Sequence, residues 1–271
     1  MKRAFRSVGA RLNRPSPSII LATAALFVAL SGGAYAALAP TTAQQAAHSP
    51  GAHWGLITRN TIGSAVGDLR SGPYGSFGTN SQPPFGTGSL GLQVSDNALS
   101  GGTPQEKVAF GNEVDFFGDQ VANLTAVGYR VFQTSENAAI SPGNLPNITL
   151  EIDPNVGSSS YTSMVWVPDP IPAPQLNKWS NHQSAVHQGD WYFTGSTGTT
   201  TGCNQTTMCS FSGAKAALVA NQNGDGPATI YTVAISKGRD NAWVGAVDGL
   251  RINDSRYDFE AYGVNETPAQ G

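Results

Sequence analysis

The stretch from Asn147 to Asp153 (NITLEID) decides the fold class of this chain. Its apolar residues Ile148, Leu150 and Ile152 alternate with polar ones, which is the period of a β-strand with one buried face. A second apolar run, 161–167 (YTSMVWV), follows after a Gly-Ser turn. The two runs together predict a pair of neighbouring strands.

Working outward, short runs of the same kind recur along the chain with turn residues between them. They cover 89–94, 108–110 paired with 113–117 around Gly111-Asn112, 124–133, 190–194, 229–236, 242–252 and 257–262. Only Gly213 to Gln222 has helical character. Strands at this spacing predict an all-β fold, an antiparallel jelly-roll-type β-sandwich. Alternation places Trp166 and Trp243 in its core.

An N-terminal signal segment precedes this domain. The basic residues come first, without any acid: Lys2, Arg3, Arg6, Arg11 and Arg14. An apolar run over 19–30 follows, and Ala34-Tyr35-Ala36 is an A-x-A-like cleavage site. We therefore expect cleavage after Ala36. An uncleaved membrane anchor stays open as the alternative, because the mild residues 31–39 extend the run toward the roughly 20 that a spanning helix needs.

The predicted organisation has four parts. They are the signal peptide or anchor over 1–36, a flexible spacer over 37–52, a single β-sandwich domain over 53–262 and a disordered tail over 263–271. The spacer is small, polar and Pro-containing, which is typical of a flexible linker. We expect the protein to be secreted or extracellular, or tethered to the membrane through the uncleaved segment.

The composition narrows the class of partner. Charged residues make up 12% of the chain, about half the usual fraction. Five of the 15 Lys and Arg residues lie in the signal segment, so the remaining chain is acidic and has no basic stripe. This pattern argues against nucleic acid as a partner. A neutral, hydrogen-bonding surface favours a polysaccharide or a cell-envelope surface.

The two cysteines, Cys203 and Cys209, lie beyond the export signal, where disulfides persist. No histidine is close enough in the sequence to make a metal site attractive. We therefore expect a disulfide between them.

Several segments of this chain resemble strands and loops of a known group of domains. They are GSLGLQV (88–94), LTAVGYRVFQ (124–133), NITLEID with YTSMVWVPD (147–169), WSNHQ (179–183), GDWYF (189–193) and 229–253 followed by YDFE (257–260). The chain resembles a family of exported bacterial β-sandwich domains, similar in look to jelly-roll carbohydrate-binding modules and concanavalin-like lectin domains. The resemblance covers most of 85–262. It implies the fold and the export, and it supplies no site residues.

Aromatic and amide residues gather in two of these segments. Trp179, His182, Trp191 and Tyr192 lie among Asn, Gln and Gly residues near strand ends. Sugar rings stack on aromatic side chains while amides bind the hydroxyls. We therefore predict these four residues as ligand-binding, in a non-enzymatic module that binds carbohydrate or an envelope surface. The alternative for Trp179 and Trp191 is a place in the core.

A second hypothesis is an enzyme. Glu113 and Asp115 resemble the acidic strand of concanavalin-like glycoside hydrolases, although Asp119 stands one residue late for the third acid. A retaining mechanism needs two carboxyls about 5–5.5 Å apart, and residues i and i+2 share a strand face. The alternative is two solvent-facing acids on an edge strand.

No cofactor is expected, and no metal site is predicted among the histidines. A structural calcium ion stays open, with Asp248, Asp258 or Glu260 as ligands, because jelly-roll modules often hold one. A third hypothesis is a purely structural or adhesive envelope protein without a small ligand.

Overall fold

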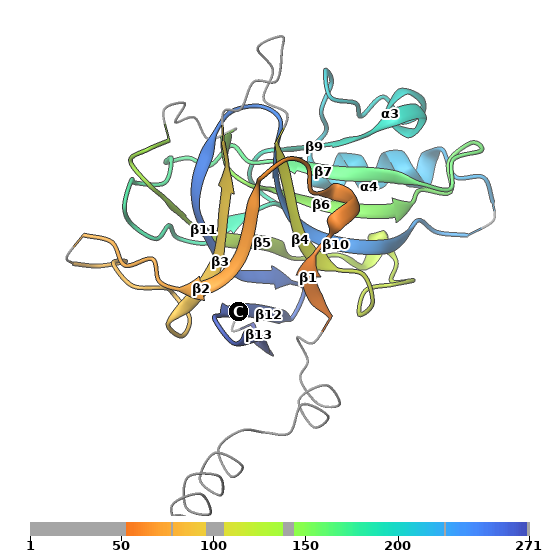
Figure 1. Ribbon diagram of the computed structural model, residues 1–271. Helices are drawn as coiled ribbons and strands as arrows, with labels where there is room; N and C mark the ends of the chain where they lie inside the picture. The colour runs from red at the N-terminus through yellow and green to blue at the C-terminus, as the bar shows by residue number, and fades with distance from the viewer. Residues whose placement is uncertain (1–52, 77, 96–105, 138–143, 225, 270–271) are drawn as a thin grey trace, which may run out of the picture. The chain divides into compact units, whose positions relative to one another are not determined.

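Two antiparallel sheets pack face to face in the computed structural model (Figure 1), which describes residues 53–76, 78–95, 106–137, 144–224 and 226–269. The predicted antiparallel β-sandwich is confirmed. All of the described residues belong to one compact unit, Pro50–Gly271. The predicted signal segment and spacer lie outside the described residues.

Each sheet draws its strands from distant parts of the chain. Sheet A has the order β1 (Trp54–Leu56), β4 (Lys107–Asn112), β10 (Thr229–Gly238), β6 (Asn147–Asp153), β7 (Thr162–Val167) and β9 (Asp190–Phe193). Sheet B has the order β13 (Gly263–Pro268), β12 (Ser255–Glu260), β11 (Trp243–Ile252), β3 (Gly88–Val94) and β2 (Val66–Ser71), with β5 (Val127–Gln133) pairing β11 and β8 (Gln183–Ser184).

The core lies between the sheets and follows the alternation of the strands. Ile148, Leu150 and Ile152 of β6 are fully buried, as NITLEID predicts. Full burial of each such side chain contributes about 1.5–3 kcal/mol. Trp166 and Trp243 are buried in the same cluster, which confirms their predicted place.

Helices are few in the described part of the chain. The predicted helix is α4 (Phe211–Ala220), capped by the Ser210 hydroxyl, which accepts the N–H of Gly213 at 3.1 Å. The sequence gives little sign of α3 (Gly195–Thr201), because Gly and Thr are weak helix formers. The 3-10 turns are η1 (Thr58–Asn60) and η2 (Val121–Asn123). Within the described ranges, no helix combines the length and apolar character of a membrane crossing.

Two predictions about local structure were wrong, one at 113–117 and one at the tail. The segment 113–117 is a turn: β4 continues through Gly111 to Asn112, whose side-chain carbonyl accepts the N–H groups of Val114 and Asp115, both at 2.9 Å. Such an Asx-turn competes with continued sheet pairing. The expected disordered tail over 263–271 was wrong for its first part, because β13 pairs with β12 from Gly263 to Pro268.

The two outer faces of the sandwich differ. On sheet B, residues 72–76, 78–87 and 176–182, named the cover here, lie over the strands. Trp179 of the cover packs on Phe132 and Ala246, and the guanidinium carbon of Arg256 lies 4.0 Å from the ring centroid of Phe85. On sheet A, strand side chains of the outer face line an open groove.

Candidate functional site

The four predicted ligand-binding residues lie in three different places. Trp191 and Tyr192 are neighbours on β9, so their side chains point to opposite faces of sheet A. Trp179 and His182 lie in a pocket at the cover of sheet B. The four residues therefore do not share one site, and the alternation of β9 already separates Trp191 from Tyr192.

Trp191 belongs to the core. It is 0% exposed and pairs in register with Trp166 of β7. Its indole N–H donates to the carbonyl of Ala185 at 2.7 Å, so its polar atom is also satisfied inside the protein. A side chain without exposed surface has no face on which a sugar ring can stack, so the structure removes Trp191 from the candidate site.

Tyr192 lies in a groove on the outer face of sheet A with a volume of about 670 Å³. Register places Thr149 of β6 opposite Val165 of β7, and Val165 opposite Tyr192 of β9. These three side chains form one row across the groove. Hydroxyl and amide groups beside the row complete its floor, from Asn147, Ser163, Thr194 and Ser236.

The walls of the groove come from two connections between elements. One is the loop closed by the disulfide between Cys203 and Cys209, whose Cα atoms are 5.5 Å apart. This confirms the predicted bridge. Gln205 and Met208 of that loop line the groove. The disulfide therefore holds one wall of the groove in place.

The turn between β10 and β11 makes the opposite wall and carries positive charge. Arg239 lies on this turn, and Lys107 of β4 lines the groove beside it. Burial and, to a smaller degree, the charge of Arg239 lower the pKa of Lys107. One end of the groove is therefore cationic, although Asp240 on the same turn pairs with Lys237.

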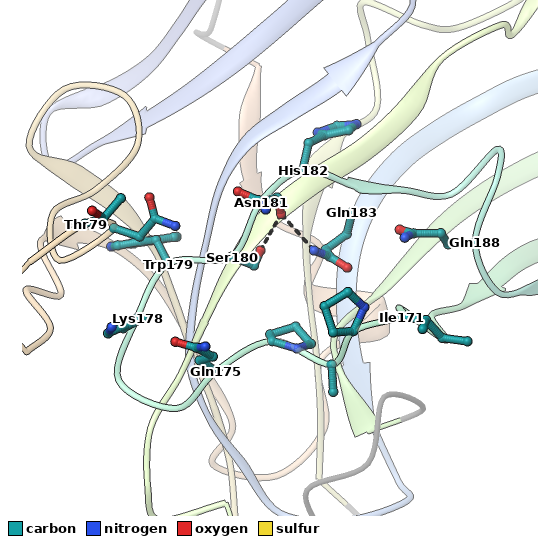
Figure 2. A pocket seen from close by; sticks show the side chains of 14 residues that line it. Thr79, Ile171, Gln175, Lys178, Trp179, Ser180, Asn181, His182, Gln183 and Gln188 are labelled. Atoms are coloured by element: carbon teal, nitrogen blue, oxygen red, sulfur yellow. Dashed lines mark hydrogen bonds between the residues drawn. The ribbon is translucent and has the colours of Figure 1, made fainter.

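The second hollow is the pocket of about 380 Å³ shown in Figure 2. Its lining is rich in amides and prolines. It comprises Thr79, Asn80, Ile171, Pro172, Ala173, Pro174, Gln175, Lys178, Trp179, Ser180, Asn181, His182, Gln183 and Gln188. Both volumes fall in or near the range of small-molecule sites, about 300–1,000 Å³.

Trp179 forms a wall of this pocket and not a stacking platform. It is only 2% exposed and lies 5.6 Å from Phe132, centroid to centroid. Its indole N–H donates to the carbonyl of Pro73 at 3.1 Å. The alternative prediction, that Trp179 lies in the core, agrees with this burial. Trp179 still lines the pocket.

His182 is partly buried beside two arginines. Burial, followed by the charges of Arg130 and Arg251, lowers the pKa of His182 to about 4. The imidazole is therefore neutral at pH 7, where it can donate one hydrogen bond and accept another.

The predicted catalytic candidates Glu113 and Asp115 are held by separate partners. Glu113 pairs with Arg59 of η1. Asp115 lies 2.7 Å from the Nδ1 atom of His53 and also accepts the side-chain N–H of Asn112. Because β4 ends at Asn112, the shared strand face that suggested a glycosidase is absent.

Arg59 also pairs with Glu151, which projects from β6 on the outer side of sheet A. Glu151 accepts the Tyr161 hydroxyl at 2.7 Å and the Asn60 amide at 2.6 Å. Burial raises the pKa of Glu151, but these hydrogen bonds outweigh it and the net pKa is lowered. Glu151 is therefore a satisfied structural acid.

The acids suggested for calcium lie near each other under the cover. Asp248 accepts the N–H of Gly249 at 2.7 Å and of Phe259 at 3.0 Å, and Glu260 accepts that of Thr87 at 2.6 Å. Within the described residues, no group of three or more His, Cys, Asp or Glu side chains is placed to hold a metal ion. Burial raises the pKa of Asp248 to about 8 and also raises that of Asp258.

Sequence reasoning missed most of the residues that line the two hollows. The polar positions of NITLEID, Asn147 and Thr149, face the groove, and their alternation with isoleucine and leucine was a usable signal. Lys178 and Gln183 had no such signal, because they lie in a segment without a period.

Comparison with known proteins adds no further assignment. No family model, curated protein or solved structure matches this chain. The fold therefore rests on the structure, and the function rests on the chemistry of the two hollows.

Proposed function

We propose that this protein is an exported, non-enzymatic β-sandwich module that binds a polysaccharide chain, in solution or on a cell envelope, along the outer face of sheet A. The observation that carries the proposal is the groove of about 670 Å³ around Tyr192. Export is supported by the signal-like sequence over 1–36, with secretion or membrane tethering as its two forms.

The chemistry of the groove suits a saccharide. Tyr192 and Val165 offer an apolar strip on which a sugar ring can lie, and Thr149 and Ser163 offer hydroxyls beside it. Rigid strands carry these side chains, so little conformational entropy is lost on binding. A groove open along the strands also leaves room for a chain longer than one sugar.

Affinity electrophoresis of the full chain through gels that contain soluble plant or bacterial-envelope polysaccharides tests this function. We expect retardation by at least one of them. Tyr192→Ala should weaken that binding at least about tenfold, which corresponds to about 1.4 kcal/mol. Tyr262→Ala is the matched control, because Tyr262 is 77% exposed between β12 and β13, outside the groove.

Absence of retardation by every polysaccharide would overturn the proposal and favour the structural or adhesive hypothesis. Equal binding by Tyr192→Ala and the unchanged chain would overturn the assignment to the groove. N-terminal sequencing of the mature protein tests the predicted export. A new terminus at Ala37 is expected if the signal is cleaved.

A further inference from the structure

The pocket at the cover of sheet B differs in chemistry from the groove. We propose that it is a second, independent binding site that takes a single sugar acid, such as a uronic acid unit at the end of a glycan. Four properties of the pocket carry this inference: its charge, an unsatisfied buried amide, its apolar wall and its size.

The charge of the pocket favours an anion. None of its described lining residues is Asp or Glu. Lys178 lines the pocket and forms no ion pair with any acid in the described ranges. Arg130 reaches the same segment, with one guanidinium N–H 3.4 Å from the carbonyl of Ser180. A carboxylate in the pocket would meet Lys178 without a competing acid among the lining residues, with Arg130 behind the same segment.

The side chain of Gln183 supplies a buried acceptor that has no donor. Gln183 is only 5% exposed. Its amide nitrogen donates to the carbonyl of Asn181 at 2.8 Å (Figure 2). No described residue donates to its Oε1 atom. Buried polar atoms are rarely left in this state, so a hydroxyl group of a ligand is a fitting partner.

Further amides and an apolar wall suit the rest of a sugar ring. Gln175, Asn181 and Gln188 add donors and acceptors around the pocket, while Pro172 and Pro174 form part of its wall. Proline has few conformations to lose, so this wall is ordered before a ligand arrives. A volume of about 380 Å³ admits one or two sugar rings but not a long chain.

Calorimetric titration of the full chain with glucuronate, glucose and acetate tests the inference. We expect glucuronate to bind at least tenfold more tightly than either of the other two, because only glucuronate offers both the carboxylate and the ring hydroxyls. Equal binding of acetate would reduce the pocket to an unspecific anion contact and overturn the proposal. Equal binding of glucose would overturn the role of charge.

Two substitutions locate the binding. Lys178→Met keeps the apolar stem and should weaken glucuronate binding at least fivefold, whereas Lys215→Met on α4, outside both hollows, should leave it unchanged. Gln183→Leu should also weaken binding at least fivefold with little change in melting temperature, because it removes an unsatisfied buried atom and the Asn181 carbonyl still accepts the Ser180 hydroxyl at 2.7 Å. Unchanged affinity in both pocket variants would overturn the proposal.

The test separates this site from the groove. Tyr192→Ala should leave glucuronate binding unchanged, since Tyr192 lies on sheet A and does not line the pocket. Loss of polysaccharide retardation with intact glucuronate binding would contradict the proposed function alone. The reverse result would contradict the second site alone.

Discussion

The outer faces of the two sheets differ in packing, although both are built from strands that alternate in the same way. On sheet B, Gly128 faces outward, and a Cβ atom there would lie 2.2 Å from the carbonyl oxygen of Gln183. On sheet A, the comparable outward positions carry Thr149, Val165 and Tyr192. The missing side chain at Gly128 leaves room for Gln183 and His182, and Trp179 packs on Phe132 of the same strand, whereas the row on sheet A lines an open groove. What packs over a face therefore decides whether its strand side chains line a groove or lie under a cover.

The largest expected difference between the faces is in stability. Trp179→Ala removes the aromatic ring by which the cover packs on Phe132 and Ala246, and should lower the free energy of unfolding by about 3–5 kcal/mol. Tyr192→Ala on the open face should cost about 1 kcal/mol or less, since one side of that ring faces the groove. Urea unfolding of both variants measures the contrast, and similar losses would contradict it.

Two of the buried acids, Asp248 and Glu151, should change the stability with pH in opposite directions. Burial and, less strongly, the charge of Asp258 raise the pKa of Asp248 from 3.8 to about 8. The protonated form is favoured in the folded state, so stability is full below about pH 4 and falls as pH rises toward 8. The expected slope is about 1.4 kcal/mol per pH unit. Asp248→Asn should flatten this fall.

For Glu151 on sheet A, the effect of pH on stability should have the opposite sign. The net pKa of Glu151 is lowered, because its hydrogen bonds outweigh its burial. Its contribution is therefore present above its ordinary pKa and is lost as pH falls below it. Glu151→Gln should flatten the acid limb of the stability curve and leave the limb above pH 5 unchanged. Urea unfolding from pH 3 to 9 tests both variants, and parallel curves would contradict the assignment.

The close approach of the Gln183 backbone to Gly128 should give a smaller difference in stability between the two faces. Gly128→Ala forces β8 and His182 of the cover away from β5 and should cost about 1–3 kcal/mol. Thr149→Ala, on the open groove, should change stability by less than about 0.5 kcal/mol. Thermal unfolding compares the two. A neutral Gly128→Ala would show that the cover adapts easily.

Loss of the disulfide should have a modest effect on stability. Replacing Cys203 and Cys209 together with serine should cost about 2 kcal/mol, because the closed loop is short. The same variant should weaken polysaccharide binding, since the loop forms a wall of the groove, while glucuronate binding at the pocket stays unchanged. Calorimetry and affinity electrophoresis measure the two ligands separately. Equal loss at both sites would indicate general unfolding.

The sequence by itself determined the fold class and the bridge. Alternation in NITLEID and YTSMVWV reports which residues face the core, because a strand has a period of two. The pair of cysteines beyond a predicted export signal was sufficient to predict the disulfide. Trp166 and Trp243 were placed in the core for the same periodic reason.

Only the tertiary structure decided which residues share a site. Trp179 and Tyr192 are close in the sequence, yet they lie on different sheets, because β9 joins the edge of sheet A and the preceding segment crosses over sheet B. The turn after Asn112 likewise depends on side-chain bonds that no periodicity reveals. Local patterns fix the direction of a side chain, but long-range strand pairing fixes its neighbours.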